Sequence, residues 1–206
     1  MLSLHSLSFA LENKVFYQNI SMTILPSSIV YIQGKNGSGK TSFLRMLAGI
    51  QLPSAGKITF SKESLPIIQL AKPYCTYIGH RFGIKLELTV LENIEFWAKL
   101  YDSEQLINAA IVYFSLQDVV DTKCYELSAG NQKKVALARL LACQSKLWLL
   151  DEGDSNLDAV NKQLLLNLII SHADNGGIVF ITSHNHPEIK SAQILNISDY
   201  EGSILL

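Results

Sequence analysis

The stretch of sequence that decides the fold is Gly34-Lys35-Asn36-Gly37-Ser38-Gly39-Lys40-Thr41. It matches the phosphate-binding pattern G-x-x-x-x-G-K-[ST] at every specified position. The apolar run 29–32 precedes it and the helix-like run 42–48 follows it, which predicts a strand, a loop and a helix in that order. Glycines let such a loop curl so that its N–H groups point inward, and the helix N-terminus adds the positive end of its dipole. The pattern in this setting predicts a site for a nucleoside triphosphate.

Individual roles follow from the same pattern. Lys40 is expected to reach the β- and γ-phosphates, and the Thr41 hydroxyl to bind Mg²⁺. Ser42, next in the chain, is expected to complete the nucleotide-binding set. A chance glycine-rich turn before Lys-Thr would match the pattern in about one chain in a hundred of this length, so nucleotide binding is favoured.

Length and composition exclude several classes of protein. The 206 residues suit one domain, and a net charge of −1 gives no electrostatic footprint for nucleic acid. The most basic spot, Lys133-Lys134 with Arg139, is interpreted as a solvated helix face. Three isolated cysteines favour a reducing cytosol. The N-terminus lacks a basic signal-peptide region, and the longest apolar tract, 164–170, is too short to span a bilayer, so we expect a chain that is neither exported nor membrane-embedded by itself.

Apolar periodicity predicts an α/β fold. Alternation at 7–11 and 20–24 predicts two strands with a hairpin turn at 12–14. Further strands are expected at 29–32, 57–60, 74–79, 147–150, 178–181, 193–197 and 203–206. Three- and four-residue spacing predicts helices within 88–115, with Ser103 as an N-cap, and at 132–142 and 159–173. Apolar strands interleaved with helices indicate a parallel sheet covered on both faces, preceded by an antiparallel β subdomain and interrupted by a helical insertion at about 82–135.

Two carboxylates follow an apolar strand candidate. Leu147-Trp148-Leu149-Leu150 ends in Asp151 and Glu152. On a central strand Asp151 would lie at the C-terminal edge beside the phosphate loop, where it can hold the Mg²⁺ shell. Glu152 would then be placed to polarise the attacking water. Any buried strand can end in an acid, but together with the phosphate loop the pair predicts hydrolysis of the nucleotide.

A second helix start carries a family resemblance. Ser128 and Gly130 at the beginning of a helix form an anion-binding cap, although an ordinary serine N-cap is an equally good reading of these residues alone. The run Leu127-Ser128-Ala129-Gly130-Asn131 resembles the L-S-G-G-Q signature of ATP-binding cassette (ABC) ATPases. The resemblance extends over nearly the whole chain, because Asp158 lies where that family has its D-loop and His184 where it has its switch histidine.

The resemblance implies a P-loop NTPase in a single domain, 1–206, that binds ATP and Mg²⁺. It also implies a head-to-tail homodimer with two ATP molecules between the subunits. The phosphate loop of one subunit would face Ser128, Ala129 and Gly130 of the other. His184 would contact the γ-phosphate and the attacking water, and Asp158 would couple the two sites.

The chain departs from the family pattern at several positions. Ala129 and Asn131 replace Gly and Gln of the signature, and Gly153 replaces a proline after the glutamate. His80 stands where a glutamine is expected, and it is expected at the Mg²⁺ either directly or, since imidazole is a softer ligand, through a water. The position of the family's adenine-stacking aromatic aligns with Leu11, and Phe9 is the nearest ring expected.

One segment indicates a subfamily. The run 77–89, the Leu-Ser-Ala-Gly signature and Leu-Trp-Leu-Leu-Asp-Glu resemble the ATP-binding subunits of haem exporters in cytochrome c biogenesis. This implies an ATP hydrolase, a haem-transporting translocase, that powers a separate integral membrane permease. It would act peripherally at the cytoplasmic face of the inner membrane, and would bind neither haem directly nor nucleic acid.

Other functions remain open at this point. The chain could serve an exporter for another substrate, or act as a soluble cassette protein on ribosomes or DNA. Such soluble proteins usually carry two cassettes, a coiled-coil insertion or basic extensions, which this sequence lacks. A P-loop kinase of small molecules would need an arginine-bearing lid and would have no use for the 127–131 signature.

Overall fold

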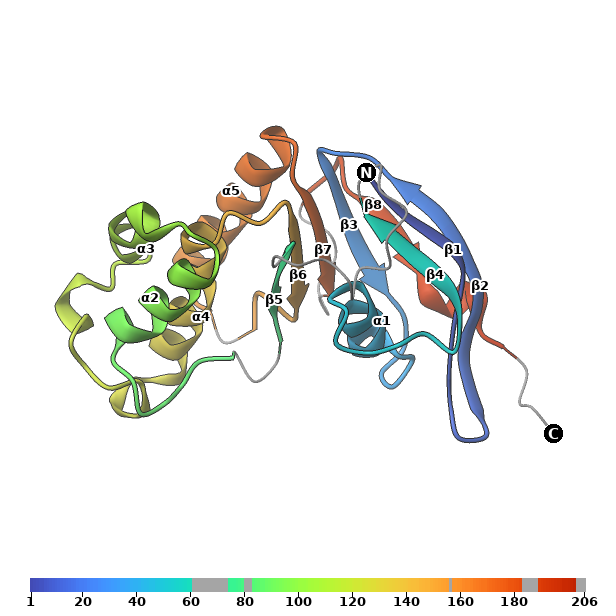
Figure 1. The fold of residues 1–206 in the computed structure, drawn as a ribbon, viewed down its shortest axis with the longest axis horizontal. Coiled ribbons are helices and arrows are strands. Elements are labelled where there is room, and N and C mark those ends of the chain that lie inside the picture. Colours follow the sequence, from blue (N-terminus) through green and yellow to red (C-terminus); the bar gives the residue numbers. More distant parts are fainter. Residues whose placement is uncertain (61–73, 80–82, 156, 183–188, 203–206) are drawn as a thin grey trace.

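The computed structural model describes residues 1–60, 74–79, 83–155, 157–182 and 189–202, and these form two sheets with helices (Figure 1). The larger sheet is parallel, with the strand order β5-β6-β7-β3-β8. Its strands are β3 Ser28–Gln33, β5 Cys75–Ile78, β6 Leu147–Asp151, β7 Ile178–Thr182 and β8 Gln193–Asn196. The predicted parallel sheet is confirmed. The strand expected at 203–206 lies outside the described residues.

The smaller sheet is antiparallel, with the order β2-β1-β4. Its strands are β1 Leu2–Leu11, β2 Lys14–Ile24 and β4 Ala55–Phe60. Glu12 and Asn13 make the hairpin turn, as predicted. Both hairpin strands are longer than the sequence indicated, because register shifts between Leu4 and Ala10 interrupt the alternation on which the prediction rested.

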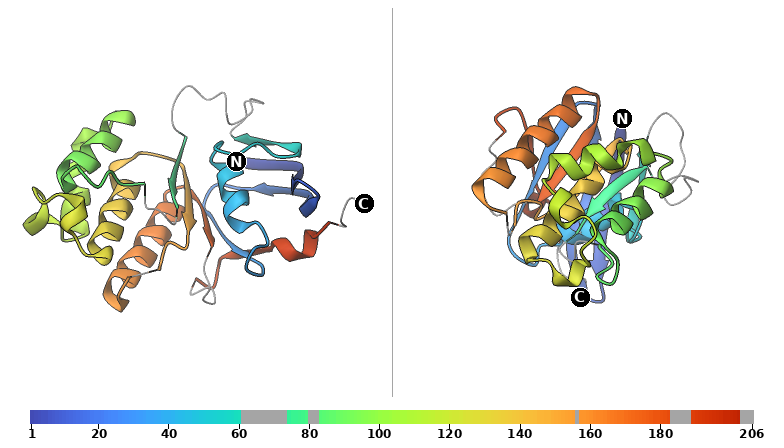
Figure 2. Two further views of the ribbon diagram at one scale, coloured as in Figure 1. Left: turned by 90° about the horizontal axis from the view of Figure 1, so that it is seen from below. Right: turned by 90° about the vertical axis from the view of Figure 1, so that its left-hand side faces the viewer.

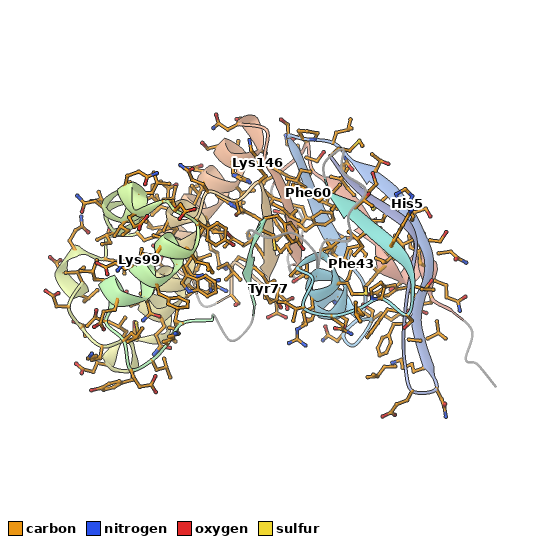
Figure 3. All side chains as sticks on the ribbon, in the orientation of Figure 1. His5, Phe43, Phe60, Tyr77, Lys99 and Lys146 are labelled. Atoms are coloured by element: carbon orange, nitrogen blue, oxygen red, sulfur yellow. The ribbon has the colours of Figure 1, made fainter. Side chains whose placement is uncertain are left out.

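Helix α1, Lys40–Leu47, fills the space between the two sheets (Figure 1). Its fully buried Phe43, labelled in Figure 3, shares one hydrophobic core with Val30 and Ile32 of the parallel sheet and with Leu4 of the antiparallel sheet. The phosphate loop is therefore anchored at both of its ends, by β3 before it and by α1 after it.

Two of the remaining helices, α4 and α5, cover the opposite face of the parallel sheet, and α2 and α3 pack against α4 on the side away from the strands, as Figures 1 and 2 show. The bounds of these helices are α2 Val90–Leu100, α3 Ile107–Tyr113, α4 Ala129–Ala142 and α5 Ala159–Asp174. Short 3-10 helices are η2 Glu104–Leu106, η3 Gln117–Val119, η4 Cys124–Glu126 and η5 Ile197–Tyr200. Neighbouring residues of β3 alternate between two cores, since Ile29 and Tyr31 join the core under α4 and α5. The sheet is thus covered on both faces, as predicted.

Helix capping differs from the sequence expectation at one position. Ser103 precedes η2, but its hydroxyl makes no capping hydrogen bond and donates to the carbonyls of Ala98, at 3.2 Å, and Ala142, at 2.6 Å. Ser103 therefore occupies the expected N-cap position, but its buried hydroxyl joins the end of α2 to the end of α4 and does not cap the helix that follows. The cap of α2 is Thr89, whose side chain and that of Glu92 form a reciprocal capping box.

The interpretation of Lys133 and Arg139 as part of a solvated basic face is wrong. Lys133 is fully buried and Arg139 is 4% exposed. The Arg139 guanidinium lies over the Trp97 ring, 3.7 Å from its centroid, and donates to the Tyr77 carbonyl at 3.3 Å. Long cationic side chains can be buried where aromatic faces and carbonyls replace their water, which a count of charges in sequence does not reveal.

A buried histidine packs between α5 and the sheet. The rings of His172 and Trp148 stack, with centroids 3.7 Å apart and planes 6° apart. Burial lowers the pKa of His172 from 6.5 to about 4, the nearby Lys146 charge acting in the same direction and a hydrogen bond with the Lys146 backbone opposing it. The folded protein therefore holds this imidazole neutral at pH values where the unfolded chain protonates it.

This difference predicts a loss of stability in mild acid. Between about pH 6.5 and pH 4 the unfolded chain binds a proton at His172 that the folded chain does not, so the free energy of unfolding falls as pH falls. We expect His172→Phe, which keeps an aromatic ring against Trp148, to reduce by about 1 kcal/mol the stability lost between pH 7.5 and pH 5. Thermal unfolding at both pH values measures this, and equal losses in the two proteins would contradict it.

Candidate functional site

The phosphate loop takes the backbone shape that its glycines permit. Gly37 has φ of 76° and Gly39, the N-cap of α1, has φ of 94°, both in the left-handed region that other residues rarely adopt. A Cβ atom at Gly39 would also lie 3.0 Å from the ring of Tyr17. The Lys40 ammonium group folds back over the loop and donates to the carbonyls of Gly34, at 2.7 Å, and Lys35, at 3.0 Å.

A cavity of about 430 Å³ lies over the start of α1. It brings together much of the predicted phosphate loop and the two predicted carboxylates at the end of β6. Its lining residues are Phe16, Asn36, Gly37, Gly39, Lys40, Thr41, Ser42, Asp151, Glu152 and Thr182. The cavity joins a helix N-terminus and a lysine to a pair of acids, which is an arrangement suited to phosphates with a divalent cation.

Asp151 is held in place by two hydroxyl groups. It is the last residue of β6 and is 4% exposed. The Thr182 hydroxyl donates to its Oδ1 at 2.8 Å, and the Tyr77 hydroxyl donates to its Oδ2 at 3.4 Å. The Asp151 carboxylate and the Thr41 hydroxyl line the same cavity, and such hard oxygen atoms fit Mg²⁺ well when phosphates and waters supply the remaining ligands.

Glu152 has an unusual backbone. Its φ of 54° is in the left-handed region, although it is not a glycine. Its N–H donates to the Thr182 carbonyl at 3.1 Å and to the Thr182 hydroxyl at 2.9 Å. Its carbonyl accepts from the Ser155 hydroxyl at 2.8 Å and from the Lys133 ammonium group at 3.1 Å. Contacts on both sides of the residue thus hold a conformation that costs energy, at the place where a water-activating base is predicted.

The charge of Lys133 is buried beside acids. Burial lowers the pKa of this ammonium group to about 8, and the charges of Asp154, Glu152 and Asp151 oppose that decrease. The sequence interpretation assigned Lys133 to a solvated face and gave it no role at the site, because a lysine at one position of a helix gives no sign of which way it faces. The apolar residues around it, at 135–138, are a weak signal that this part of α4 is buried.

The predicted signature residues begin α4. Ser128 is the N-cap, and its hydroxyl accepts from the Asn131 N–H at 3.2 Å, so the N-cap reading is confirmed. Ser128 and Ala129 are exposed, and Gly130 is half-buried. None of these three lines the cavity over the start of α1. The capped N-terminus of α4 is therefore not part of the wall of that cavity.

The other predicted residues are placed differently. Asp158 is the N-cap of α5, accepts from the backbone N–H and the side-chain amide of Asn161, each at 2.8 Å, and lies on the surface. The hydrogen bond from the Asn161 N–H lowers the pKa of Asp158. His80 and His184 lie outside the described residues, so their predicted roles stay predictions.

A second cavity, of about 610 Å³, adjoins the loop at the β1–β2 hairpin. It shares residues with the first cavity, and extends the space over the loop toward the C-terminal segment. Its lining residues are Leu11, Glu12, Asn13, Lys14, Val15, Phe16, Lys35, Asn36, Gly37, Ser38, Glu201 and Gly202. A flat ring system attached to phosphates at the loop would extend into this space.

The ring at this cavity is Phe16, which sequence reasoning missed. Phe9, expected as the nearest ring, is 4% exposed and packs behind Phe16, with centroids 5.2 Å apart. Leu11 is exposed and lines the cavity without offering a ring. The sequence signal for Phe16 is weak. This residue lies between the buried Val15 and Tyr17 of β2, but the register shift at this point interrupts the alternation that would assign it to the opposite face.

Sequence comparison identifies relatives across the whole chain. A profile of the ABC transporter family matches residues 17–155. The cytochrome c biogenesis ATP-binding export protein CcmA of Rickettsia bellii is 56% identical over 198 residues, covering 96% of this chain and 100% of that protein. The protein of the same name from Wolbachia pipientis is 42% identical, over 91% of this chain and 91% of its own length. That from Haemophilus influenzae is 36% identical, over 97% of this chain and 96% of its own length.

Solved structures share the fold. An ABC transporter ATP-binding protein from Pyrococcus furiosus superposes with a TM-score of 0.84 at 24% identity, covering 98% of this chain and 99% of its own. An ATP-binding cassette solved as a dimer with ADP and phosphate gives 0.80 at 21% identity, covering 90% of this chain and 88% of its own. The family profile matches more than half of this chain, and full-length relatives are more than 50% identical to it. The chain therefore belongs to the ABC transporter family as an ATP-binding, ATP-hydrolysing cassette.

Proposed function

We propose that this chain is the ATPase subunit of an exporter that serves cytochrome c biogenesis, working as a haem-transporting translocase or in ATP-driven release of a haem carrier. The observation that carries the proposal is identity of 53–56% to several export proteins of that name, over 96% of this chain and 98–100% of theirs. Identity at this level across the whole length favours a shared task over a shared fold alone.

ATP fits across the two joined cavities. The triphosphate would lie on the loop 34–42 and the base beside Phe16 at the hairpin, where stacking on the ring requires no base-specific contact. Lys40, held over the loop by two carbonyls, would exchange these for the β- and γ-phosphates. Thr41 and Asp151 would hold Mg²⁺, which neutralises charge on the phosphates when bound, and His80 would act on it through a water.

Hydrolysis requires a base on the water and support for the γ-phosphate. Glu152 lines the phosphate cavity, and hydrogen bonds to its N–H and its carbonyl fix the main chain from which the side chain extends. It would accept a proton from the attacking water. His184 would contact the γ-phosphate and the same water.

Two copies of the chain would complete each site. The N–H groups at the start of α4 have no intrahelical acceptor, and the exposed cap at Ser128, Ala129 and Gly130 suits an anion supplied by another molecule. In a head-to-tail homodimer this cap would face the γ-phosphate bound by the partner, and Asp158 would lie between the two sites.

We further propose a membrane partner. Within the part of the chain that the structure describes, no helix combines the length and the apolar character needed to cross a bilayer. The export proteins named above support a separate integral membrane permease, with this subunit peripheral at the cytoplasmic face of the inner membrane. Haem would stay with the membrane partners, and nucleic acid would take no part.

Exposed apolar side chains support a docking surface. Leu86, Phe96 and Leu100 are each more than 40% exposed on the helical layer, and Lys85 lies over the Phe96 ring at 3.9 Å. A short permease helix could bind there.

Two variants separate hydrolysis from binding. Glu152→Gln removes the base and leaves the phosphate loop intact, so we expect ATP affinity to change by no more than about threefold, turnover to fall by about a hundredfold or more, and a stable ATP-bound dimer to form. Lys40→Ala should instead weaken ATP binding and leave the chain monomeric with ATP. Equilibrium binding, ATPase assays and size-exclusion chromatography measure these outcomes. Equal losses of affinity in both variants would contradict the assignment.

Phe16 is predicted to support the base and not the phosphates. Since stacking is worth about 1–3 kcal/mol per base, we expect Phe16→Ala to weaken ATP binding at least about fivefold and Phe16→Trp to preserve it. Competition by inorganic triphosphate, which has no base, should be unchanged in both. Phe60→Ala, at a ring that does not line the cavities described here, serves as the control. If Phe16→Ala weakens the binding of ATP and of inorganic triphosphate equally, the Phe16 ring does not stack on the adenine base.

The cellular role predicts a selective defect. In a strain without this gene, we expect c-type cytochromes to be lost while b-type cytochromes remain, because only the former depend on this export step. The wild-type gene should restore them and Glu152→Gln should not, as shown by haem staining of membrane proteins and difference spectra. Normal c-type cytochromes in the deleted strain would refute the cytochrome c role and leave the ATPase assignment standing.

A further inference from the structure

Lys133 connects the signature helix to the predicted catalytic base. It lies one turn into α4, fully buried, and its ammonium group donates to the backbone carbonyl of Glu152 at 3.1 Å. The contact joins a helix whose exposed N-cap is Ser128 to a residue in the phosphate cavity. A buried ammonium group loses its hydration, so a lysine used only for packing would be a costly choice at this position.

The main chain of Glu152 needs such a contact. A left-handed φ at a residue other than glycine is strained, and it persists where its surroundings hold it. Thr182 holds the N–H side from β7, and Ser155 holds the carbonyl side from within the same turn. Lys133 donates a further hydrogen bond to the carbonyl of Glu152 from a different element, the helix α4.

Charge strengthens this connection. Asp154, Glu152 and Asp151 lie near enough to stabilise the ammonium form of Lys133. A hydrogen bond with a charged donor is stronger than one between neutral groups, and it is stronger still away from water. The position of α4 and the orientation of the Glu152 backbone are therefore linked by one side chain.

We propose that Lys133 is a positioning residue for ATP hydrolysis, which fixes the main chain of Glu152 and ties the orientation of its carboxylate to the position of α4. The inference rests on the proposed role of Glu152 as the base. In the proposed dimer, the N-terminus of α4 faces the ATP bound by the partner. Lys133 connects this helix directly to Glu152, which acts on the ATP bound by its own chain.

The test compares Lys133→Met, which keeps the length of the side chain without its charge, with Lys133→Arg, which restores a cationic donor. Rates are expressed per ATP-binding site, titrated in each preparation, so that loss of folded protein does not count as loss of activity. We expect Lys133→Met to lower kcat about tenfold or more with KM for ATP within about threefold, and Lys133→Arg to recover most of kcat. Lys99→Met, at an exposed lysine of the helical layer labelled in Figure 3, is the control and should match the wild type.

The double variant Lys133→Met/Glu152→Gln separates the possibilities. If Lys133 acts through Glu152, single-turnover hydrolysis by the double variant should be within about twofold of that by Glu152→Gln alone. The inference would be overturned if the losses of hydrolysis rate in the two single variants multiply in the double variant. It would also be overturned if Lys133→Met leaves kcat unchanged or raises only the KM for ATP. If Glu152→Gln itself hydrolyses ATP normally, the proposed function of Glu152 fails first, and the two failures are distinguishable.

Discussion

The hydroxyl group of Thr182 holds the centre of the site together. It is 1% exposed at the end of β7, donates to the Asp151 carboxylate and accepts from the Glu152 N–H. In the sheet register Thr182 lies beside Asp151 on one side and Ile32 on the other, just before the phosphate loop. One side chain thus aligns the carboxylates of β6 with the loop that follows β3. Valine would keep the shape but would leave a buried carboxylate and a buried N–H without this partner.

The sequence predicted the parts of the site that local patterns specify. The loop 34–41 needs glycines in left-handed conformations, and the spacing of these glycines can be recognised in the sequence. Asp151 and Glu152 follow an uninterrupted apolar run, so their place at a strand end was predictable. The N-cap at Ser128 was predictable for the same reason, because a serine before a helical pattern has a known local use.

Tertiary contacts decided the rest. The burial of Lys133 and Arg139 depends on a carbonyl of Glu152 and a ring of Trp97, which come from distant parts of the chain. Ser103 carries a typical capping side chain, yet its hydroxyl bonds to two helix ends that only the fold brings together. Phe16 was hidden by the irregular register of the hairpin, where bulges weaken the alternation that would have pointed to it.

The distribution of charge is consistent with the proposal that two copies of the chain complete each site. The phosphate cavity contains Lys40 and a helix N-terminus, and its cations are balanced by Asp151 and Glu152. The start of α4 has no such balance, because Ser128 satisfies the N–H of Asn131 while helix geometry leaves those of Ala129 and Gly130 without an intrahelical acceptor. These groups are tolerated because they face water, and they would gain most from an anion brought against them. A bound triphosphate exposed at the cavity of another copy is such an anion, so ATP itself would supply the attraction that brings the two halves together.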